Sequence, residues 1–174
     1  MIPHPIRRAG PPSLDIQIQS PLWDAQPQAA QTMRDVLAAA AIVLSTIDGE
    51  VGIVLTDDQS IRALNRQWRG VDKPTNVLSF PAAHTQTSVS TKVFGDIVMA
   101  YETLKRESDD ENRNFLHHLA HLTVHGFLHL CGYGHDVDAE AEQMEDLESK
   151  IMLSIDLPDP WLGRHLDREL TRDA

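Results

Sequence analysis

Hydrophobic and polar positions alternate or cluster along the chain in ways that define its strands. Residues 14–18 alternate between Leu or Ile and polar side chains, which is typical of a half-buried strand. Short apolar runs at 51–55, 77–80 and 94–100 predict three further strands. The last run is apolar at successive positions, as expected for an internal strand covered on both faces. The pattern therefore predicts a small sheet of four strands.

Five longer segments have the spacing or the composition of helices. They cover residues 27–45, 58–68, 102–110, 113–131 and 136–155. The inner face of the second helix is expected to hold Ile61, Leu64 and Trp68. The inner face of the fifth is expected to hold Val137, Ala141, Met144, Leu147 and Ile151. In this order the segments predict an α+β domain, a small mixed four-stranded sheet packed with about five helices.

The length of 174 residues suits one domain with a proper core. We expect that domain to cover residues 14–157. Residues 1–13 carry charge without the apolar run of a signal peptide, so they predict a flexible leader. Residues 82–91 are polar and predict a surface loop, and residues 158–174 predict a polar C-terminal tail.

Composition narrows the classes of function. The formal net charge of −11 argues against tight, nonspecific nucleic-acid binding through a large basic face, although it leaves room for a small basic site. The single cysteine, Cys131, allows no internal disulfide, so a reducing, cytoplasmic location is expected. No apolar run reaches the 18 residues that suggest a membrane helix.

The candidate chemistry lies in residues 117–136, which hold six of the nine histidines. Residues four apart share one face of a helix, so the ladder formed by His117, His121, His125 and His129 can direct imidazoles to one side. A zinc ligand lies about 2.0 to 2.1 Å from the ion. Because two histidines eight residues apart are separated by about 12 Å along a helix, a third ligand must come from beyond the helix.

Gly132 and Gly134 allow the chain to end this helix and turn back, and His135 follows at once. We therefore predict a three-histidine site of His125, His129 and His135 at the end of a central helix, with a fourth position open to water or substrate. Zn²⁺ is the expected ion, and another divalent metal is possible. His117, His118 and His121 are expected to be ordinary core or surface histidines, and Cys131 a small core residue pointing away from the ligands.

The spacing also matches zinc peptidases of the H-E-x-x-H-x-x-G-x-x-H type at every position but one. Gly126 stands where such an enzyme has the glutamate that takes a proton from the metal-bound water. The metal scaffold is present and the base of a peptidase is missing. The carboxylates of the fifth helix predict a solvated face instead of further ligands; they are Asp138, Glu140, Glu142, Glu145 and Glu148.

Four blocks of sequence resemble the YbeY-type endoribonucleases, the ribosomal RNA maturation factors of bacteria. The blocks are residues 64–70 (LNRQWRG), 72–80 (DKPTNVLSF), 95–98 (GDIV) and 121–135 (HLTVHGFLHLCGYGH). The resemblance spans about residues 14–155. It implies a metal-dependent endoribonuclease that prefers single-stranded RNA, matures the 3′ end of the small-subunit ribosomal RNA and takes part in ribosome quality control.

By matching positions, the resemblance implies metal ligands His125, His129 and His135, with His125 also in the catalytic centre, and an essential arginine at Arg69. It implies single-stranded precursor ribosomal RNA and the small ribosomal subunit or its assembly proteins as partners, with neither a membrane nor DNA. Members usually have Asp where this chain has Gly134, which leaves the orientation of His135 in question. Asn76 is a lesser departure, since many members carry Asp there.

The residues themselves leave alternatives open. Arg69 presents a planar fork suited to phosphate, but it is equally suited to an ion pair with Asp72 or Asp96. Arg62, Arg66 and Lys73 extend a basic strip or simply form a solvated surface. Two other classes of function also fit: a metallohydrolase of peptidase-like spacing, and a non-catalytic ribosome assembly factor whose zinc is structural.

Overall fold

The computed structural model describes residues 10–45, 49–83 and 92–164. The helices and strands within these ranges are β1 (Ser13–Ile18), the 3-10 helix η1 (Pro21–Ala25), α1 (Ala29–Leu44), β2 (Gly49–Thr56), α2 (Asp58–Arg69), β3 (Val77–Pro81), β4 (Lys92–Ala100), α3 (Tyr101–Asp110), α4 (Phe115–Leu130) and α5 (Asp138–Leu153). None of the described helices has the length and apolar character needed to cross a membrane.

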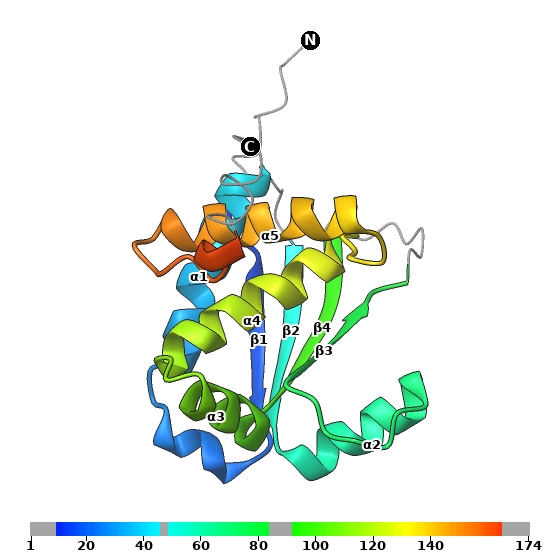
Figure 1. Cartoon of the computed structure of the whole chain (residues 1–174). Helices are drawn as coiled ribbons and strands as arrows, with labels where there is room; N and C mark the ends of the chain where they lie inside the picture. Colours follow the sequence, from blue (N-terminus) through cyan, green and yellow to red (C-terminus); the bar gives the residue numbers. More distant parts are fainter. Residues whose placement is uncertain (1–9, 46–48, 84–91, 165–174) are drawn as a thin grey trace.

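The four strands form one mixed sheet in the order β1-β2-β4-β3. β1, β2 and β4 are parallel, and β3 pairs antiparallel with β4 at the edge. Helices α1, α4 and α5 gather over one face, and α4 crosses the sheet (Figure 1). The predicted α+β architecture with a small mixed sheet is confirmed.

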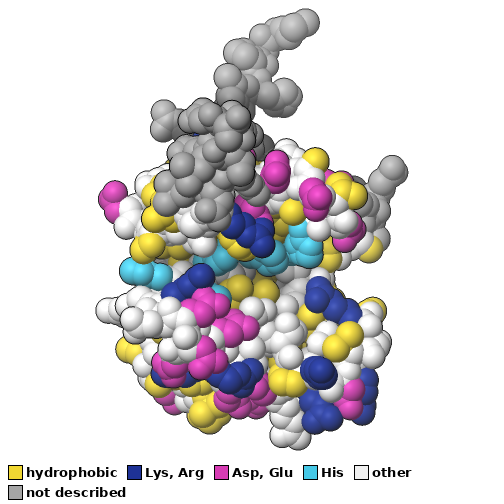
Figure 2. Space-filling model, in the orientation of Figure 1, with side chains coloured by type: hydrophobic (Ala, Val, Ile, Leu, Met, Phe, Trp, Pro, Cys, Tyr) yellow, Lys and Arg dark blue, Asp and Glu magenta, His cyan; other side chains and the backbone are white. Residues whose placement is uncertain are grey.

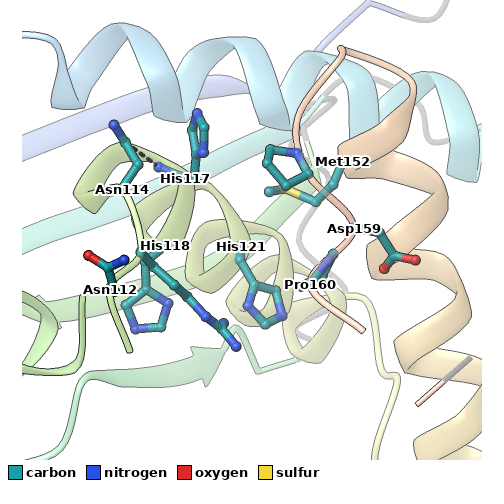
Figure 3. A pocket seen from close by; sticks show the side chains of 10 residues that line it. Asn112, Asn114, His117, His118, His121, Met152, Asp159 and Pro160 are labelled. Atoms are coloured by element: carbon teal, nitrogen blue, oxygen red, sulfur yellow. Dashed lines mark hydrogen bonds between the residues drawn. The ribbon is translucent and has the colours of Figure 1, made fainter. Parts of the chain in front are cut away.

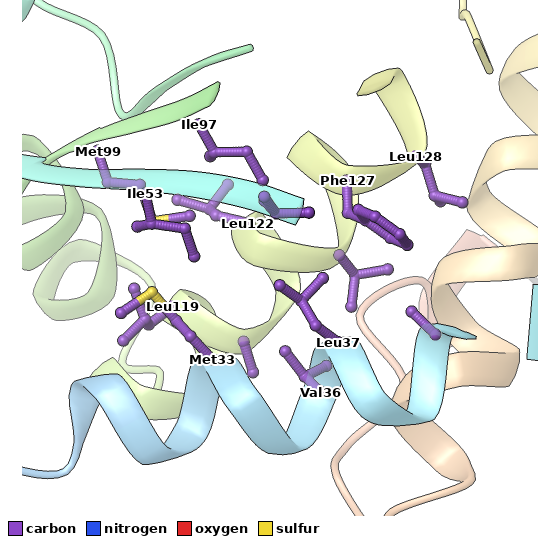
Figure 4. Close-up of a cluster of buried hydrophobic side chains, with 14 of the residues drawn as sticks. Met33, Val36, Leu37, Ile53, Ile97, Met99, Leu119, Leu122, Phe127 and Leu128 are labelled. Atoms are coloured by element: carbon purple, nitrogen blue, oxygen red, sulfur yellow. The ribbon is translucent and has the colours of Figure 1, made fainter. Parts of the chain in front are cut away.

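β4 separates two apolar clusters, because successive side chains of a strand point to opposite faces. Ile97 and Met99 lie in the larger cluster, while Val98 and Ala100 lie in the smaller one. The larger cluster is the main core, where α1 and α4 meet the sheet (Figure 4). Its fully buried side chains include Met33, Leu37, Ile53, Leu119 and Phe127. The prediction of an internal strand covered on both faces is thus confirmed.

The smaller cluster lies under α2, and it does not extend to Trp68, which was expected on the inner face of that helix. Ile61 of α2 is fully buried and Leu64 packs against the cluster, but Trp68 is 64% exposed. Trp68 contacts only the ring of Phe80 among the described aromatic residues, at a centroid distance of 5.9 Å. The last turn of α2 projects past the sheet (Figure 1), so the helical spacing continues where there is no core left to cover. Two other expected inner positions, Ile18 and Val137, are also exposed, each at an end of its element.

The central position of α4 follows from its sequence, which is apolar on almost every side. Asn114 caps its start by accepting hydrogen bonds from the backbone N–H groups of Leu116 (2.9 Å) and His117 (3.2 Å). Its end is set by Gly132, whose φ of 92° lies in the left-handed region that other residues avoid. The chain then closes with a hydrogen bond from the Tyr133 N–H to the Leu128 carbonyl. The predicted turn after α4 is confirmed.

The segment after α5 packs on the fold beyond the boundary expected at residue 157. The Asp159 carboxylate accepts a hydrogen bond from the Ser149 hydroxyl (2.6 Å), and Trp161 stacks edge-on with His121. At the other end, β1 begins at Ser13, inside the expected leader. The remaining leader, loop and tail predictions concern residues 1–9, 84–91 and 165–174, which lie outside the described residues.

Candidate metal centre

The end of α4 and the turn that follows bring three histidines together. Nitrogen atoms of His125, His129 and His135 all lie within 4.8 Å of one another, as the sequence predicted. His125 and His129 come from successive turns of α4, and His135 arrives from the turn that Gly132 begins. Among the described residues, no other His, Cys, Asp or Glu joins this group, so three ligands are available and a fourth position is open. The cluster could hold a metal ion.

Hydrogen bonds fix which nitrogen of each helical ligand is free. Nδ1 of His129 lies 3.0 Å from the carbonyl oxygen of Tyr133, and Nδ1 of His125 lies 2.7 Å from a carboxylate oxygen of Glu148. Both oxygens only accept hydrogen bonds, so each Nδ1 carries the proton. In the neutral rings both Nε2 atoms then carry lone pairs, and they face each other at 3.1 Å. Two acceptors at that distance repel unless a cation lies beside both.

The electrostatics of the pair point the same way. Burial lowers the pKa of His129, and the nearby His125 lowers it further, so the neutral, metal-binding form of the ring is favoured. Burial by itself would raise the pKa of Glu148, but hydrogen bonds from His121 and His125 outweigh it and bring the pKa to about 2. Glu148 is therefore a fixed negative charge behind His125.

Glu148 corrects the expectation that the carboxylates of α5 are solvated. Glu148 and Glu145 are 1% and 6% exposed. Besides His125, Glu148 accepts hydrogen bonds from Nε2 of His121 (2.8 Å) and from the indole N–H of Trp161 (2.5 Å). The signal was present in the sequence: position 148 is four residues after Met144 and three before Ile151, inside the apolar stripe of α5, where a lone carboxylate needs a partner.

Arg69 reaches the same centre from a different element. It is the last residue of α2, and Gly70 ends that helix with a φ of 71°. Arg69, Ser79 and the three histidines line one cavity of about 460 Å³. Asp72 pairs with Arg62 instead (2.8 Å), and within the described residues no hydrogen bond or ion pair joins Arg69 to Asp72 or Asp96. The cavity thus combines three imidazoles with a guanidinium that pairs with neither of these two carboxylates within the described residues.

The other three histidines of α4 lie outside the group of three, and two of them have carboxylate partners. His118 and His121 are buried, and their Nε2 atoms lie 2.8 Å from Glu107 and Glu148. Figure 3 shows His117, His118 and His121 among the side chains that line one pocket beside α4. Together the histidines follow a hollow that crosses one face of the molecule, with basic side chains on both of its rims (Figure 2).

Three positions singled out in the sequence have clear surroundings. A Cβ on Gly126 would lie 3.0 Å from Ile97 and 3.1 Å from Ser79, so α4 packs too closely on the sheet there to take a larger side chain without a shift. A Cβ on Gly134 would lie 3.4 Å from a carboxylate oxygen of Glu140. Glu140 of α5 therefore already places a carboxylate where a side chain at position 134 would begin. Cys131 packs against the main core outside the ligand group, and burial raises the pKa of its thiol to about 11.

Known proteins resemble this chain in sequence along most of its length. The family model described as Endoribonuclease YbeY matches residues 16–156, which is most of the chain. This chain belongs to the endoribonuclease YbeY family. An Endoribonuclease YbeY of Bradyrhizobium sp. strain BTAi1 is 49% identical over 159 residues, covering 88% of this chain and 94% of the relative. One from Rhodopseudomonas palustris strain BisA53 is 48% identical over 156 residues, covering 87% and 91%.

The fold also has a solved counterpart. The solution structure of TM1509 from Thermotoga maritima matches with a TM-score of 0.54 at 21% identity, covering 82% of this chain and 91% of that one. At this identity the likeness concerns the fold alone. The YbeY family membership therefore rests on the sequence matches, and the fold likeness is consistent with it.

Proposed function

We propose that this chain is a zinc-dependent endoribonuclease that cuts single-stranded RNA, and that His125, His129 and His135 hold the ion. The observation that carries the proposal is the open three-histidine cluster in one cavity with Arg69. The names of the relatives supply the substrate class, since they are called endoribonucleases. Zn²⁺ is favoured by an all-imidazole donor set, although such sites also take other divalent metals.

The spacing of the two donors on α4 fits a zinc ion. Ligands about 2.0 to 2.1 Å from zinc at tetrahedral angles lie roughly 3.3 Å apart, and the two Nε2 atoms of α4 are 3.1 Å apart. When bound, zinc supplies a Lewis acid for a phosphoryl oxygen and lowers the pKa of a bound water toward about 7. The residues of the chain hold the ligands ready: Tyr133 and Glu148 fix the ring orientations before the ion arrives.

Arg69 is the phosphate-binding group in this proposal. Its guanidinium lines the cavity, and a planar fork of donors matches two phosphate oxygens. Charge builds on those oxygens as the phosphorus becomes five-coordinate, so a positioned cation lowers the barrier more than it strengthens substrate binding. His125 and Arg69 are thus the catalytic residues, His125 as a ligand next to the reacting phosphate and Arg69 as the partner of the developing charge.

Two nucleophiles fit the site, a water molecule and the RNA 2′-hydroxyl. They differ in their products: attack by the 2′-hydroxyl leaves a 2′,3′-cyclic phosphate and a free 5′-hydroxyl, and a 2′-deoxy sugar at the cut position blocks it. Attack by water tolerates the deoxy sugar. Analysis of the product ends on matched ribo and deoxy substrates therefore separates the two routes.

The biological substrate we propose is precursor ribosomal RNA, with the small-subunit 3′ end as the main target and a part in ribosome quality control in the cytoplasm. This step rests on the resemblance of the motif blocks to the YbeY family. An acidic protein with a net charge of −11 gains little affinity from the RNA backbone alone. We therefore propose that the small subunit or its assembly proteins dock the enzyme on its target.

The test is cleavage of a labelled single strand carrying a small-subunit precursor end. Metal-loaded wild type, Arg69→Ala, His129→Ala and the control Arg66→Ala are compared, with metal content measured on each sample. We expect wild type and Arg66→Ala to cut, Arg69→Ala to keep its metal and cut far more slowly, and His129→Ala to lose both metal and cleavage. Equal residual cutting in all four would mean a contaminant and would favour the assembly-factor alternative.

The same samples address the peptidase alternative. Gly126 supplies no carboxylate, and the close packing of Ile97 and Ser79 leaves little room for one. We expect no cleavage of casein by any metal-loaded sample. Metal-dependent casein cleavage that His129→Ala abolishes would replace the ribonuclease proposal with the peptidase.

A further inference from the structure

A second cavity adjoins the metal centre and has two carboxylates in its lining. It measures about 350 Å³, at the small end of the range of about 300 to 1,000 Å³ that is usual for small-ligand sites. It shares Asn76, Val77 and His125 with the metal cavity, so the two are neighbours along the hollow. Where the metal cavity has Arg69, this one has the carboxylates of Glu107 and Glu111. An RNA strand that crosses the metal centre therefore meets carboxylates in the neighbouring cavity.

Glu107 is held in place with acceptor capacity to spare. The Asn76 amide donates to both carboxylate oxygens (3.2 and 3.0 Å), and Nε2 of His118 lies 2.8 Å from Oε2. Asn76 is itself fixed, because its carbonyl oxygen accepts from the Val77 N–H (2.7 Å). A carboxylate can accept about four hydrogen bonds, and Oε1 has only the Asn76 contact among the described residues. The Glu107 side chain is 32% exposed, so an incoming donor can reach it.

The charge of Glu107 is stable at neutral pH. Burial would raise the pKa of the carboxyl group, but hydrogen bonds from His118 and Asn76 lower it below its ordinary value. Glu111 adds a second carboxylate, which pairs with Arg113, another lining residue, at 2.7 Å. The exposed carboxylate of Glu107 is therefore the group in this cavity that attracts N–H donors. The apolar wall of the cavity comes from Trp161, Pro160 and Leu122, which suits the face of a planar ring.

Among the parts of an RNA strand, only a base brings N–H donors and a flat apolar face together. On the Watson–Crick edge, guanine presents its N1–H and 2-amino groups side by side. Adenine and cytosine present one amino group beside a ring nitrogen acceptor, and uracil presents one N–H between two carbonyls. A carboxylate attracts adjacent donors and repels acceptors, so guanine fits Glu107 best.

We propose that the cavity formed by Glu107, His118 and Trp161 binds an unpaired guanine base next to the phosphate being cut, with Glu107 accepting from its Watson–Crick donors. The inference rests on the proposed ribonuclease function and adds a base preference to it. Asn76 and His118 are positioning residues in this scheme, since they orient the carboxylate without reaching the base.

The experiment uses uridine-rich single strands that carry one guanosine, placed at a different position in each strand, and matched strands with inosine, which lacks the 2-amino group. Metal-loaded wild type, Glu107→Gln and Glu50→Gln are compared; Glu50 is an exposed carboxylate of β2. We expect wild type and Glu50→Gln to cut at a constant offset from the guanosine. Inosine should slow that cut by roughly five- to a hundredfold, the usual cost of a lost base contact. Glu107→Gln should lose the guanosine preference and keep its metal.

The outcomes separate the two proposals. Cuts at positions unrelated to the guanosine, equal rates for guanosine and inosine, or an unchanged preference in Glu107→Gln would overturn the guanine site and leave the ribonuclease standing. A general loss of structure in Glu107→Gln cannot imitate the expected result, because it would slow the guanosine and inosine strands alike. If wild type cuts no strand, the ribonuclease proposal fails. Binding measured by fluorescence anisotropy then decides the site: equal affinity for guanosine and inosine strands overturns it, and a preference that Glu107→Gln removes supports it.

Discussion

The two halves of α4 each place two histidines on neighbouring helical turns, and their surroundings give them opposite uses. In the first half, His118 and His121 turn Nε2 toward the carboxylates of Glu107 and Glu148. In the second half, His125 and His129 use Nδ1 for their hydrogen bonds and leave both Nε2 atoms facing each other. The difference lies in which ring nitrogen the neighbouring groups engage, since all four side chains are histidines of one helix.

Glu148 joins the two halves. One of its oxygens holds His125 and the other holds His121 and the Trp161 indole. A buried carboxylate is costly unless every lone pair is engaged, so Glu148 is both stabilised by the first half and a support for the second. The predictions below test whether the halves differ as these contacts require.

Loss of a ligand should have the largest effect. We expect His129→Ala to lose bound metal and to reduce RNA cleavage more than about a thousandfold, because both the Lewis acid and the activated water depend on the ion. His117→Ala, in the other half of the helix, should change neither. Metal content by atomic emission and single-turnover cleavage rates provide the check. Full metal occupancy in His129→Ala would exclude the three-histidine site.

Loss of Arg69 should come next, and should spare the metal. A donor aimed at developing charge typically contributes about a hundred- to a thousandfold in rate, so Arg69→Ala should cut that much more slowly at full metal content. Arg69→Lys should recover part of the rate, since it restores the charge without the planar fork. If Arg69→Ala instead raises the Michaelis constant and leaves the turnover rate unchanged, Arg69 binds substrate and transition state equally.

Low pH should destabilise the fold by protonating Glu148, the carboxylate that contacts both halves of α4. The pKa of Glu148 in the metal-free fold is about 2, below its ordinary value of 4.5. The unfolded chain therefore takes up this proton at higher pH than the fold does. The stabilisation is complete above about pH 4.5 and is lost as pH falls to about 2. The shift corresponds to about 3 kcal/mol in the free energy of unfolding.

Urea unfolding of the metal-free protein at several pH values measures this contribution. Glu148→Gln should show a flatter decline between pH 4.5 and 2 than wild type does, because the other carboxylates titrate in both proteins. Identical slopes in the two proteins would mean that Glu148 is not the titrating group.

How far the sequence predicts this molecule depends on how local each feature is. The sheet, the five helices and the ligand triple follow from periodicity, spacing and one glycine turn, so they could be read from neighbouring residues. The burial of Glu148 could be read from the apolar stripe of α5, but its partners could not, because they depend on how α5 packs against α4. His125, which it holds, is 23 residues away in the chain. The prediction that Trp68 is buried was wrong for the same reason. Its place on the helix was right, but the sheet ends before it. Arg69 needed the family resemblance, since its spacing allowed an ion pair with Asp72 equally well.

The smallest expected effect is a difference in metal affinity between Glu148→Gln and Glu107→Gln, which alter the carboxylate partners of the two halves. Glu148→Gln keeps the shape of the side chain but replaces one acceptor oxygen with an amide donor and removes the charge that favours a strongly donating His125. Changes to such supporting groups cost about ten- to a hundredfold in metal affinity, and we expect that loss in a titration against a competing chelator. Glu107→Gln alters the matching contact to His118, which is not a ligand, so its metal affinity should equal that of wild type. Equal losses in both variants would show that α4 responds as one unit and that the division between its halves is incidental. A loss confined to Glu148→Gln would show that the hydrogen-bond partner of each ring decides which histidines of α4 become ligands.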